Sequence, residues 1–258
     1  MLLASKQAFV FAATGAIAGE TARTFAREGA EVWLSGRNAA ALDALADEIT
    51  AAGGKAHVDV VDATDASQVA AYLERAVKQA GRVDVVFNGI GGRPSDLRYP
   101  QLAETQSLED FLFPMQHIVG SQFLTARSAA HYMTQQGSGA IVTLSATLSG
   151  MTAPNMAGIS AACGAIEAMT RSLAGEYGGY NIRVNCVRGS GMPETRTIQE
   201  TVAGQIAVSG KPPSMTLPPL GRPITVGETA ATAAFLASDY ASGMTGQVVT
   251  VCAGAFVG

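Results

Sequence analysis

The chain has 258 residues and a net charge of −4, with 48% hydrophobic and 15% charged residues. This length fits one α/β domain, and the charged share lies below the roughly 25% typical of soluble proteins. The negative net charge argues against a protein that binds nucleic acid through electrostatic attraction. No apolar run reaches the ~20 residues of a membrane span. So few charges indicate that other subunits cover part of the surface.

The cysteines and the first residues bear on the cellular compartment. Cys163, Cys186 and Cys252 are far apart and show no metal-binding spacing. We therefore expect buried thiols in a reducing environment and no metal site. Lys6 and the apolar residues 7–18 imitate a signal peptide. The same stretch fits a first strand and turn, so we expect a cytoplasmic protein.

Short apolar runs alternate with helical patterns along the whole chain. Continuous apolar runs suit strands that are buried on both faces of a parallel sheet, and Asn38 and Asp65 stand where helix N-caps are expected. Irregular segments are expected at 89–107 and 189–223. Strands are predicted at 8–13, 31–35, 55–61, 83–87, 140–144, 182–187 and 247–251, and helices at 17–28, 39–52, 66–80, 114–136, 155–177, 196–208 and 227–237.

This alternation of strands and helices predicts the fold class. Successive strand–helix–strand units form right-handed crossovers, which put helices on both faces of a parallel sheet. We see no linker, repeat or low-complexity tract in the sequence. The prediction is an α/β protein with a doubly wound, parallel, seven-stranded sheet of Rossmann-like type, as a single domain over residues 1–258.

Six short segments stand out along the chain. They are residues 34–38 (Leu-Ser-Gly-Arg-Asn), 62–65 (Asp-Ala-Thr-Asp), 83–88 (Val-Asp-Val-Val-Phe-Asn), 182–187 (Ile-Arg-Val-Asn-Cys-Val), 220–223 (Leu-Gly-Arg-Pro) and 244–248 (Met-Thr-Gly-Gln-Val). In this order they resemble the short-chain dehydrogenase/reductase family. The resemblance implies a nicotinamide dinucleotide, a glycine-rich turn after the first strand, and an Asn-Ser-Tyr-Lys set for hydride chemistry.

The glycine-rich turn of this family can be placed in two registers. A partial match begins at Thr14-Gly15, but the spacing from Lys6 and from Gly29 favours a register without gaps over residues 11–18. In that register Phe11 replaces the threonine, and alanine replaces all three glycines, at positions 12, 16 and 18. Each added methyl group occupies space that the pyrophosphate needs. We expect no dinucleotide to bind tightly, unless the helix N-terminus alone suffices.

Three residues match the family's binding site for the adenosine half of the coenzyme. Arg37 stands where an arginine faces a 2′-phosphate, which favours NADP over NAD. Asp62 matches the aspartate that meets the adenine ring, and Asn88 matches the first Asn of the family's Asn-Asn-Ala-Gly. Each has a purely structural interpretation as well: a surface charge, a turn residue and a brace at a strand end. We treat the three as a vestigial cofactor-binding set.

The family's catalytic set falls on four residues that cannot perform its chemistry. The resemblance aligns Tyr with Ile159, Lys with Cys163, Ser with Ala146 and Asn with Ile118. Reduction needs a phenol that exchanges a proton and a cation that lowers its pKa. Aliphatic side chains and a thiol supply neither, so we predict no catalytic residues of the standard kind. Cys163 as a nucleophile is an alternative, but no base in the sequence must face it.

Three functions remain open at this point. The first is a catalytically silent structural or regulatory subunit, assembling as a homo-oligomer, such as a tetramer, or with an active paralogue. It is favoured because residues 161–177 and 244–251, which form subunit interfaces in the family, keep the family pattern. The second is non-redox chemistry in an apolar pocket bordered by residues 91–107 and 190–219. The third is an NADP-linked oxidoreductase that uses unorthodox residues.

Overall fold

The computed structural model describes residues 1–212 and 217–256, and its centre is one parallel sheet of seven strands. The strands follow the order β3-β2-β1-β4-β5-β6-β7, and each neighbouring pair is parallel. The predicted doubly wound fold class is confirmed. The strands are β1 Gln7–Phe11, β2 Glu31–Gly36, β3 Lys55–Val60, β4 Val85–Asn88, β5 Gly139–Ala146, β6 Ile182–Gly189 and β7 Val248–Val251.

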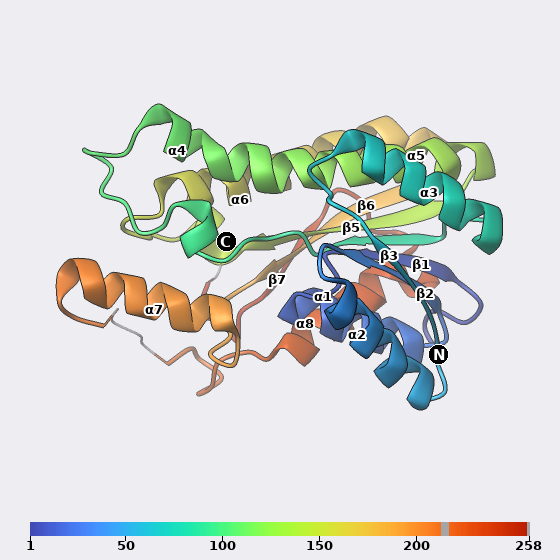
Figure 1. The fold of residues 1–258 in the computed structure, drawn as a ribbon, viewed down its shortest axis with the longest axis horizontal. Coiled ribbons are helices and arrows are strands. Elements are labelled where there is room, and N and C mark those ends of the chain that lie inside the picture. The colour runs from blue at the N-terminus through green and yellow to red at the C-terminus, as the bar shows by residue number, and fades with distance from the viewer. Residues whose placement is uncertain (213–216, 257–258) are drawn as a thin grey trace.

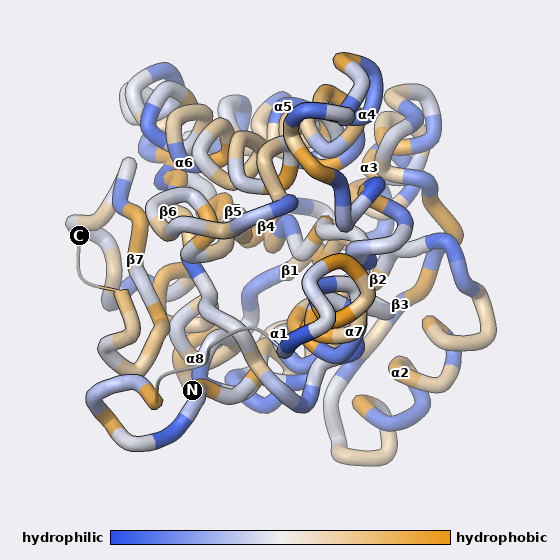
Figure 2. Tube along the Cα trace, turned by 90° about the vertical axis from the view of Figure 1, so that its left-hand side faces the viewer, coloured by the Kyte–Doolittle hydropathy of each residue, from blue (hydrophilic) through white to orange (hydrophobic). Residues whose placement is uncertain are grey.

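Helices cover both faces of the sheet (Figure 1). One layer contains α1, α2 and α8, and the other contains α3, α5 and α6. The tube view from the side shows the same sheet between the same two layers (Figure 2). The helices are α1 Ala16–Arg27, α2 Ala39–Ala51, α3 Ala66–Ala80, α4 Leu108–Pro114, α5 Gly120–Gln136, α6 Ala157–Tyr177, α7 Arg196–Ser209 and α8 Val226–Ala237.

Side chains and glycines that the sequence supplies locally fix several helix ends. Asn38 caps α2 by accepting a hydrogen bond from the Ala41 amide at 3.1 Å. The Asp65 carboxylate caps α3 by accepting hydrogen bonds from the amides of Ser67 and Gln68. Gly81, with φ 78°, ends α3 in the left-handed region that glycine tolerates. The N-caps predicted at Asn38 and Asp65 are therefore confirmed.

The segment before α5 differs from the prediction of one helix over 114–136. The helix begins earlier, at Leu108, because the Ser107 hydroxyl accepts a hydrogen bond from the Asp110 amide at 3.1 Å. Pro114 suggests a helix start because proline favours the first turn, but here it ends α4. A π-helical turn, Met115–Val119, then leads into α5 and buries Ile118.

α7 stands apart from both helical layers. Figure 1 shows it at the end of the sheet, below the segment that leads into α4. It has no buried residue in the described part of the chain, whereas α8 has six. Its position therefore depends on contacts at the sheet's end, not on a place in the core. Within residues 1–212 and 217–256, we find no helix that combines the length and the apolar character of a bilayer span.

Candidate functional site

The candidate site lies at the carboxyl ends of the strands, where β1 and β4 are neighbours. The chain leaves β1 toward α1 on one face of the sheet and leaves β4 toward α4 and α5 on the other. In open α/β sheets such a reversal of direction opens the crevice in which ligands bind. The turn after β1, the ends of β2 and β3, and the segments after β4, β5 and β6 all meet at this edge.

The turn between β1 and α1 is built from small residues and is open to solvent. Ala12 has φ 56°, a left-handed conformation that favours glycine. This is the geometry expected where the family has its first glycine, in agreement with the register over residues 11–18. Gly15 is the N-cap of α1 and has no side chain to satisfy the first amides, while Thr14 and Ala16 are exposed. Ala18 is buried.

Arg37 and Asp62 lie near each other at the ends of β2 and β3. Hydrogen bonds from Thr64, at 2.9 Å from its amide and 2.7 Å from its hydroxyl, hold the pKa of Asp62 below its usual range. The positive charge of Arg37, and that of His117 when protonated, lower the pKa of Asp62 further. Arg37 is exposed. The structure thus brings two of the three predicted adenosine-site residues together at an accessible edge.

Asn88, the third predicted residue, is fully buried behind this edge. Its amide nitrogen donates to the Gln122 carbonyl at 3.1 Å, and its amide oxygen accepts from the Thr125 hydroxyl at 2.6 Å. Both ends of the side chain are therefore engaged with α5. The brace interpretation describes what Asn88 does in the structure, and its role toward a ligand remains a prediction.

The four positions aligned with the catalytic set lie where β5, α6 and the π-helical turn meet. Ala146 ends β5, Ile159 and Cys163 lie on the first turns of α6, and Ile118 lies on the π-helical turn. Ile118 belongs to an apolar cluster with Leu97, Ile166 and Cys186, and Ile159 packs against it. Burial raises the pKa of the Cys163 thiol. Ile118 and Ile159 therefore lie in apolar surroundings.

The His117 ring stacks on Phe113, with centroids 5.2 Å apart, and Phe113 itself packs against this cluster.

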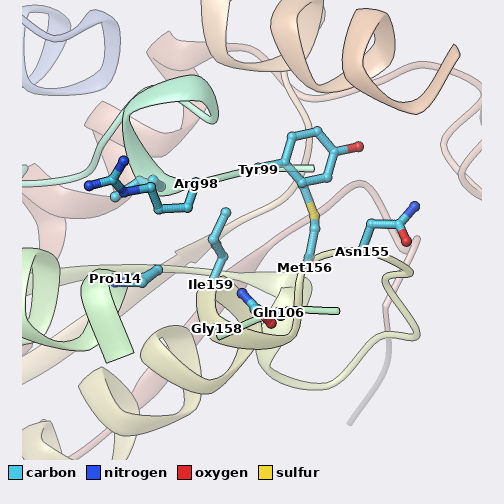
Figure 3. A pocket seen from close by; sticks show the side chains of 9 residues that line it. Arg98, Tyr99, Gln106, Pro114, Asn155, Met156, Gly158 and Ile159 are labelled. Carbon is cyan, nitrogen blue, oxygen red and sulfur yellow. The ribbon is translucent and has the colours of Figure 1, made fainter. Parts of the chain in front are cut away.

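The segment before α4 fills the space beside Ile159. Leu97 lies in a short 3-10 turn, Ser95–Leu97, and is 5% exposed. A hollow of only about 10 Å³ remains beside it, which is room for about one water molecule. Figure 3 shows the side chains of Arg98 and Tyr99 over Ile159, with Met156 next to them. A substrate-sized space is absent from this hollow.

The sequence analysis missed a buried ion pair next to Cys163. The carboxylate of Glu167 on α6 accepts from Arg188 on β6 at 2.9 and 2.7 Å, and from the hydroxyls of Ser145 at 3.0 Å and Ser149 at 2.6 Å. Burial by itself would raise the pKa of Glu167, but these hydrogen bonds outweigh it and lower the pKa. An arginine inside an apolar strand was the available signal, because a buried charge needs a partner.

In the described residues no cluster of three or more metal-ligating side chains is found.

Comparisons with known proteins agree on one group of relatives. The family model described as enoyl-(acyl carrier protein) reductase matches residues 12–255. An uncharacterized oxidoreductase of Methylorubrum extorquens is 32% identical over 98% of both chains. The 3-oxoacyl-[acyl-carrier-protein] reductase of Thermotoga maritima is 29% identical over 98% of this chain and 99% of its own. The structure of NAD+-bound xylitol dehydrogenase is 26% identical, covers 98% and 100% of the two chains, and superimposes with a TM-score of 0.90.

Proposed function

Because the chain belongs to the short-chain dehydrogenase/reductase family, we propose that it is a catalytically silent member that acts as a structural or regulatory subunit. It assembles with itself or with an active paralogue. The residue that carries the proposal is Ile159, which the resemblance aligns with the family's tyrosine and which packs against the cluster around Ile118. Cys163, which the resemblance aligns with the lysine, is buried, and burial raises the pKa of its thiol.

The residues present fit only half of a nicotinamide coenzyme. Arg37 and Asp62 offer a cation and a carboxylate at an accessible edge, which suits a phosphorylated adenosine. Ala12, Ala16 and Ala18 carry methyl groups at the predicted pyrophosphate turn, and Ile118, which the resemblance aligns with the family's catalytic asparagine, lies in an apolar cluster with Leu97. We therefore propose no hydride step through this site, and weak NADP binding if any.

Purified chain tests this proposal directly. We expect no oxidation of NADPH or NADH with a panel of ketones and acyl thioesters, and no reduction of NADP⁺ with alcohols. We expect the chain to form oligomers by light scattering, or to form a mixed oligomer with a family paralogue in native mass spectrometry. Robust turnover by the isolated chain would overturn the silent assignment. A monomer that joins no paralogue would overturn the subunit role.

The second candidate is an NADP-dependent oxidoreductase with unorthodox residues. The printed names of the relatives favour it, since they are reductases and dehydrogenases, and the xylitol dehydrogenase structure holds NAD+. Turnover of NADPH with a carbonyl substrate distinguishes the two candidates, because both allow NADPH to bind. Turnover that Arg37→Ala abolishes, and that Arg23→Ala on α1 leaves unchanged, would favour the oxidoreductase. Non-redox chemistry receives no support from the 10 Å³ hollow beside Ile159.

A further inference from the structure

We propose that residues 93–101 form an internal plug, and that the plug's Leu97 occupies a binding site for a small aliphatic group. The site is the apolar cluster of Ile118, Ile166 and Cys186, with Ile159 and Phe113 packed against it. The proposal assigns a ligand class and a means of access to this edge of the sheet. It does not depend on the chain being silent.

Leu97 inserts into this cluster from a segment whose charged residues are exposed, although Pro94 and Tyr99 are buried as well. Leu97 is 5% exposed, whereas Leu102, five residues later, is 46% exposed. Gly92 makes the insertion possible, because a Cβ at that position would lie 2.6 Å from the Leu97 Cγ. Leu97 therefore fills a space bounded by aliphatic side chains of other elements, much as an alkyl ligand would.

One side of the plug is fastened to α4. The Arg98 guanidinium lies 4.8 Å from the centre of the Phe113 ring, and its Nε is 3.6 Å from an Asp110 carboxylate oxygen. The Gln101 side chain donates to the other Asp110 oxygen at 3.3 Å. These contacts hold the residues that follow Leu97 against the helix that begins the neighbouring wall.

Contacts from Glu200, Thr201 and Gly204 of α7 hold the other side of the plug, and we call these contacts the clasp. The Glu200 carboxylate accepts from Arg93 at 3.0 Å and from the Ser95 hydroxyl at 3.3 Å. The Tyr99 hydroxyl donates to the Thr201 carbonyl at 3.1 Å, and the Tyr99 ring lies so close to Gly204 that a Cβ there would be 2.7 Å away. Since α7 has no buried residue of its own in the described chain, it is anchored by these contacts with the plug.

The side chains of the apolar cluster determine which ligand binds, and the contacts between the plug and α7 determine when the site opens. The cluster holds aliphatic and aromatic side chains and a thiol, so it selects an uncharged alkyl group and gains by removing that group from water. The clasp consists mainly of partly exposed polar contacts, which contribute little stability each. Release of α7 from Arg93 and Ser95 frees the plug, and Leu97 then exchanges with a ligand of similar shape.

Binding of hexan-1-ol, measured by ligand-observed nuclear magnetic resonance on the full chain, tests the plug. Leu97→Ala leaves the space open, and we expect its Kd for hexan-1-ol to be about tenfold lower than that of the wild type, which must first expel Leu97. Glu200→Gln weakens the clasp without altering the cluster, and we expect its Kd to fall about threefold. The doubly polar 1,6-hexanediol should bind every form weakly.

Two matched variants control for general loosening of the chain. Leu102→Ala removes an exposed leucine from the same segment, and Glu104→Gln neutralises an exposed carboxylate next to it; neither should change the Kd. The proposal is overturned if folded Leu97→Ala and Glu200→Gln bind hexan-1-ol no better than the wild type. Should Leu97→Ala not fold, Glu200→Gln alone decides. Turnover of NADPH by the wild type would refute the proposed silent function and leave this result standing.

Discussion

Ala18 on α1 and Gly89 after β4 occupy a space that holds only one Cβ atom. A Cβ built on Gly89 would lie 2.5 Å from the Cβ of Ala18, closer than two such atoms ever approach. Ala18 is 1% exposed and packs in the core between α1 and the sheet. The methyl group of Ala18 is thus matched by the missing side chain of Gly89.

This close contact predicts that Gly89→Ala destabilises the chain and that Ala18→Gly partly restores its stability. Gly89→Ala should lower the free energy of unfolding by about 1–3 kcal/mol through overpacking, while Ala18→Gly removes the nearest of the atoms in its way. The double variant should recover part of the loss, with a coupling of about 0.5–3 kcal/mol in a denaturant-based cycle. Rescue is incomplete because the Phe87 ring also lies 2.9 Å from the added Cβ. Strictly additive effects would contradict the shared space.

The sequence predicts the sheet, its helical layers and most element bounds because these depend on local periodicity and caps. The apolar run around Phe9 and the side chain of Asp65 each carry their signal within a few residues. The predicted start of the helix at Pro114 was wrong because a cap at Ser107 competes with it. Choosing between two valid local signals requires the packing of the whole edge.

Some residues of the candidate site could likewise be predicted from the sequence, and others could not. The family resemblance assigned Arg37 and Asp62 to one adenosine site, and the structure has them near each other after β2 and β3. No local pattern shows that Leu97 enters the aliphatic cluster, or that Glu167 meets Arg188. Those contacts join residues that are far apart in sequence, and only the crossing of α6 over β6 and the course of the segment before α4 create them.

The left-handed backbone conformation of Ala12 predicts that a glycine at this position stabilises the chain. With φ 56°, its backbone lies in a region that costs an L-residue about 1–2 kcal/mol. Ala12→Gly removes this strain and adds an entropic cost of about 0.5–1 kcal/mol, so thermal unfolding should show a net gain of up to about 1.5 kcal/mol. Ala44→Gly, exposed in the middle of α2, is the control and should lose about 1 kcal/mol. Equal losses in both variants would contradict a left-handed Ala12.

The Glu167–Arg188 pair predicts an acid-dependent contribution to stability. The pKa of Glu167 is lowered in the folded chain, so the pair contributes fully above the ordinary glutamate pKa of 4.5 and its contribution is lost as the pH falls through the lower folded value. Glu167→Gln removes the charge-assisted hydrogen bonds that Arg188 donates to the carboxylate at 2.9 and 2.7 Å, and should cost about 1.5–3 kcal/mol at pH 7.

Urea unfolding at a series of pH values checks this prediction. The difference between the wild type and Glu167→Gln should be largest at neutral pH and should shrink at acid pH. The exposed carboxylate of Glu104 offers a control, since Glu104→Gln should follow the wild type throughout. A difference that stays constant from pH 7 to acid would mean that hydrogen-bond geometry, not charge, stabilises the pair.

The burial of the three thiols predicts that they react slowly with disulfide reagents in the native chain. Cys163, Cys186 and Cys252 are 6%, 0% and 8% exposed, and burial raises the pKa of Cys163 and raises that of Cys186 to about 12. Since the thiolate is the reactive form, a disulfide reagent at pH 8 should modify the native protein far more slowly than free cysteine and should titrate all three thiols in urea. Cys163→Ser should leave the native rate unchanged. A fast native phase that this variant removes would instead identify Cys163 as an activated nucleophile and reopen the case for covalent chemistry at the start of α6.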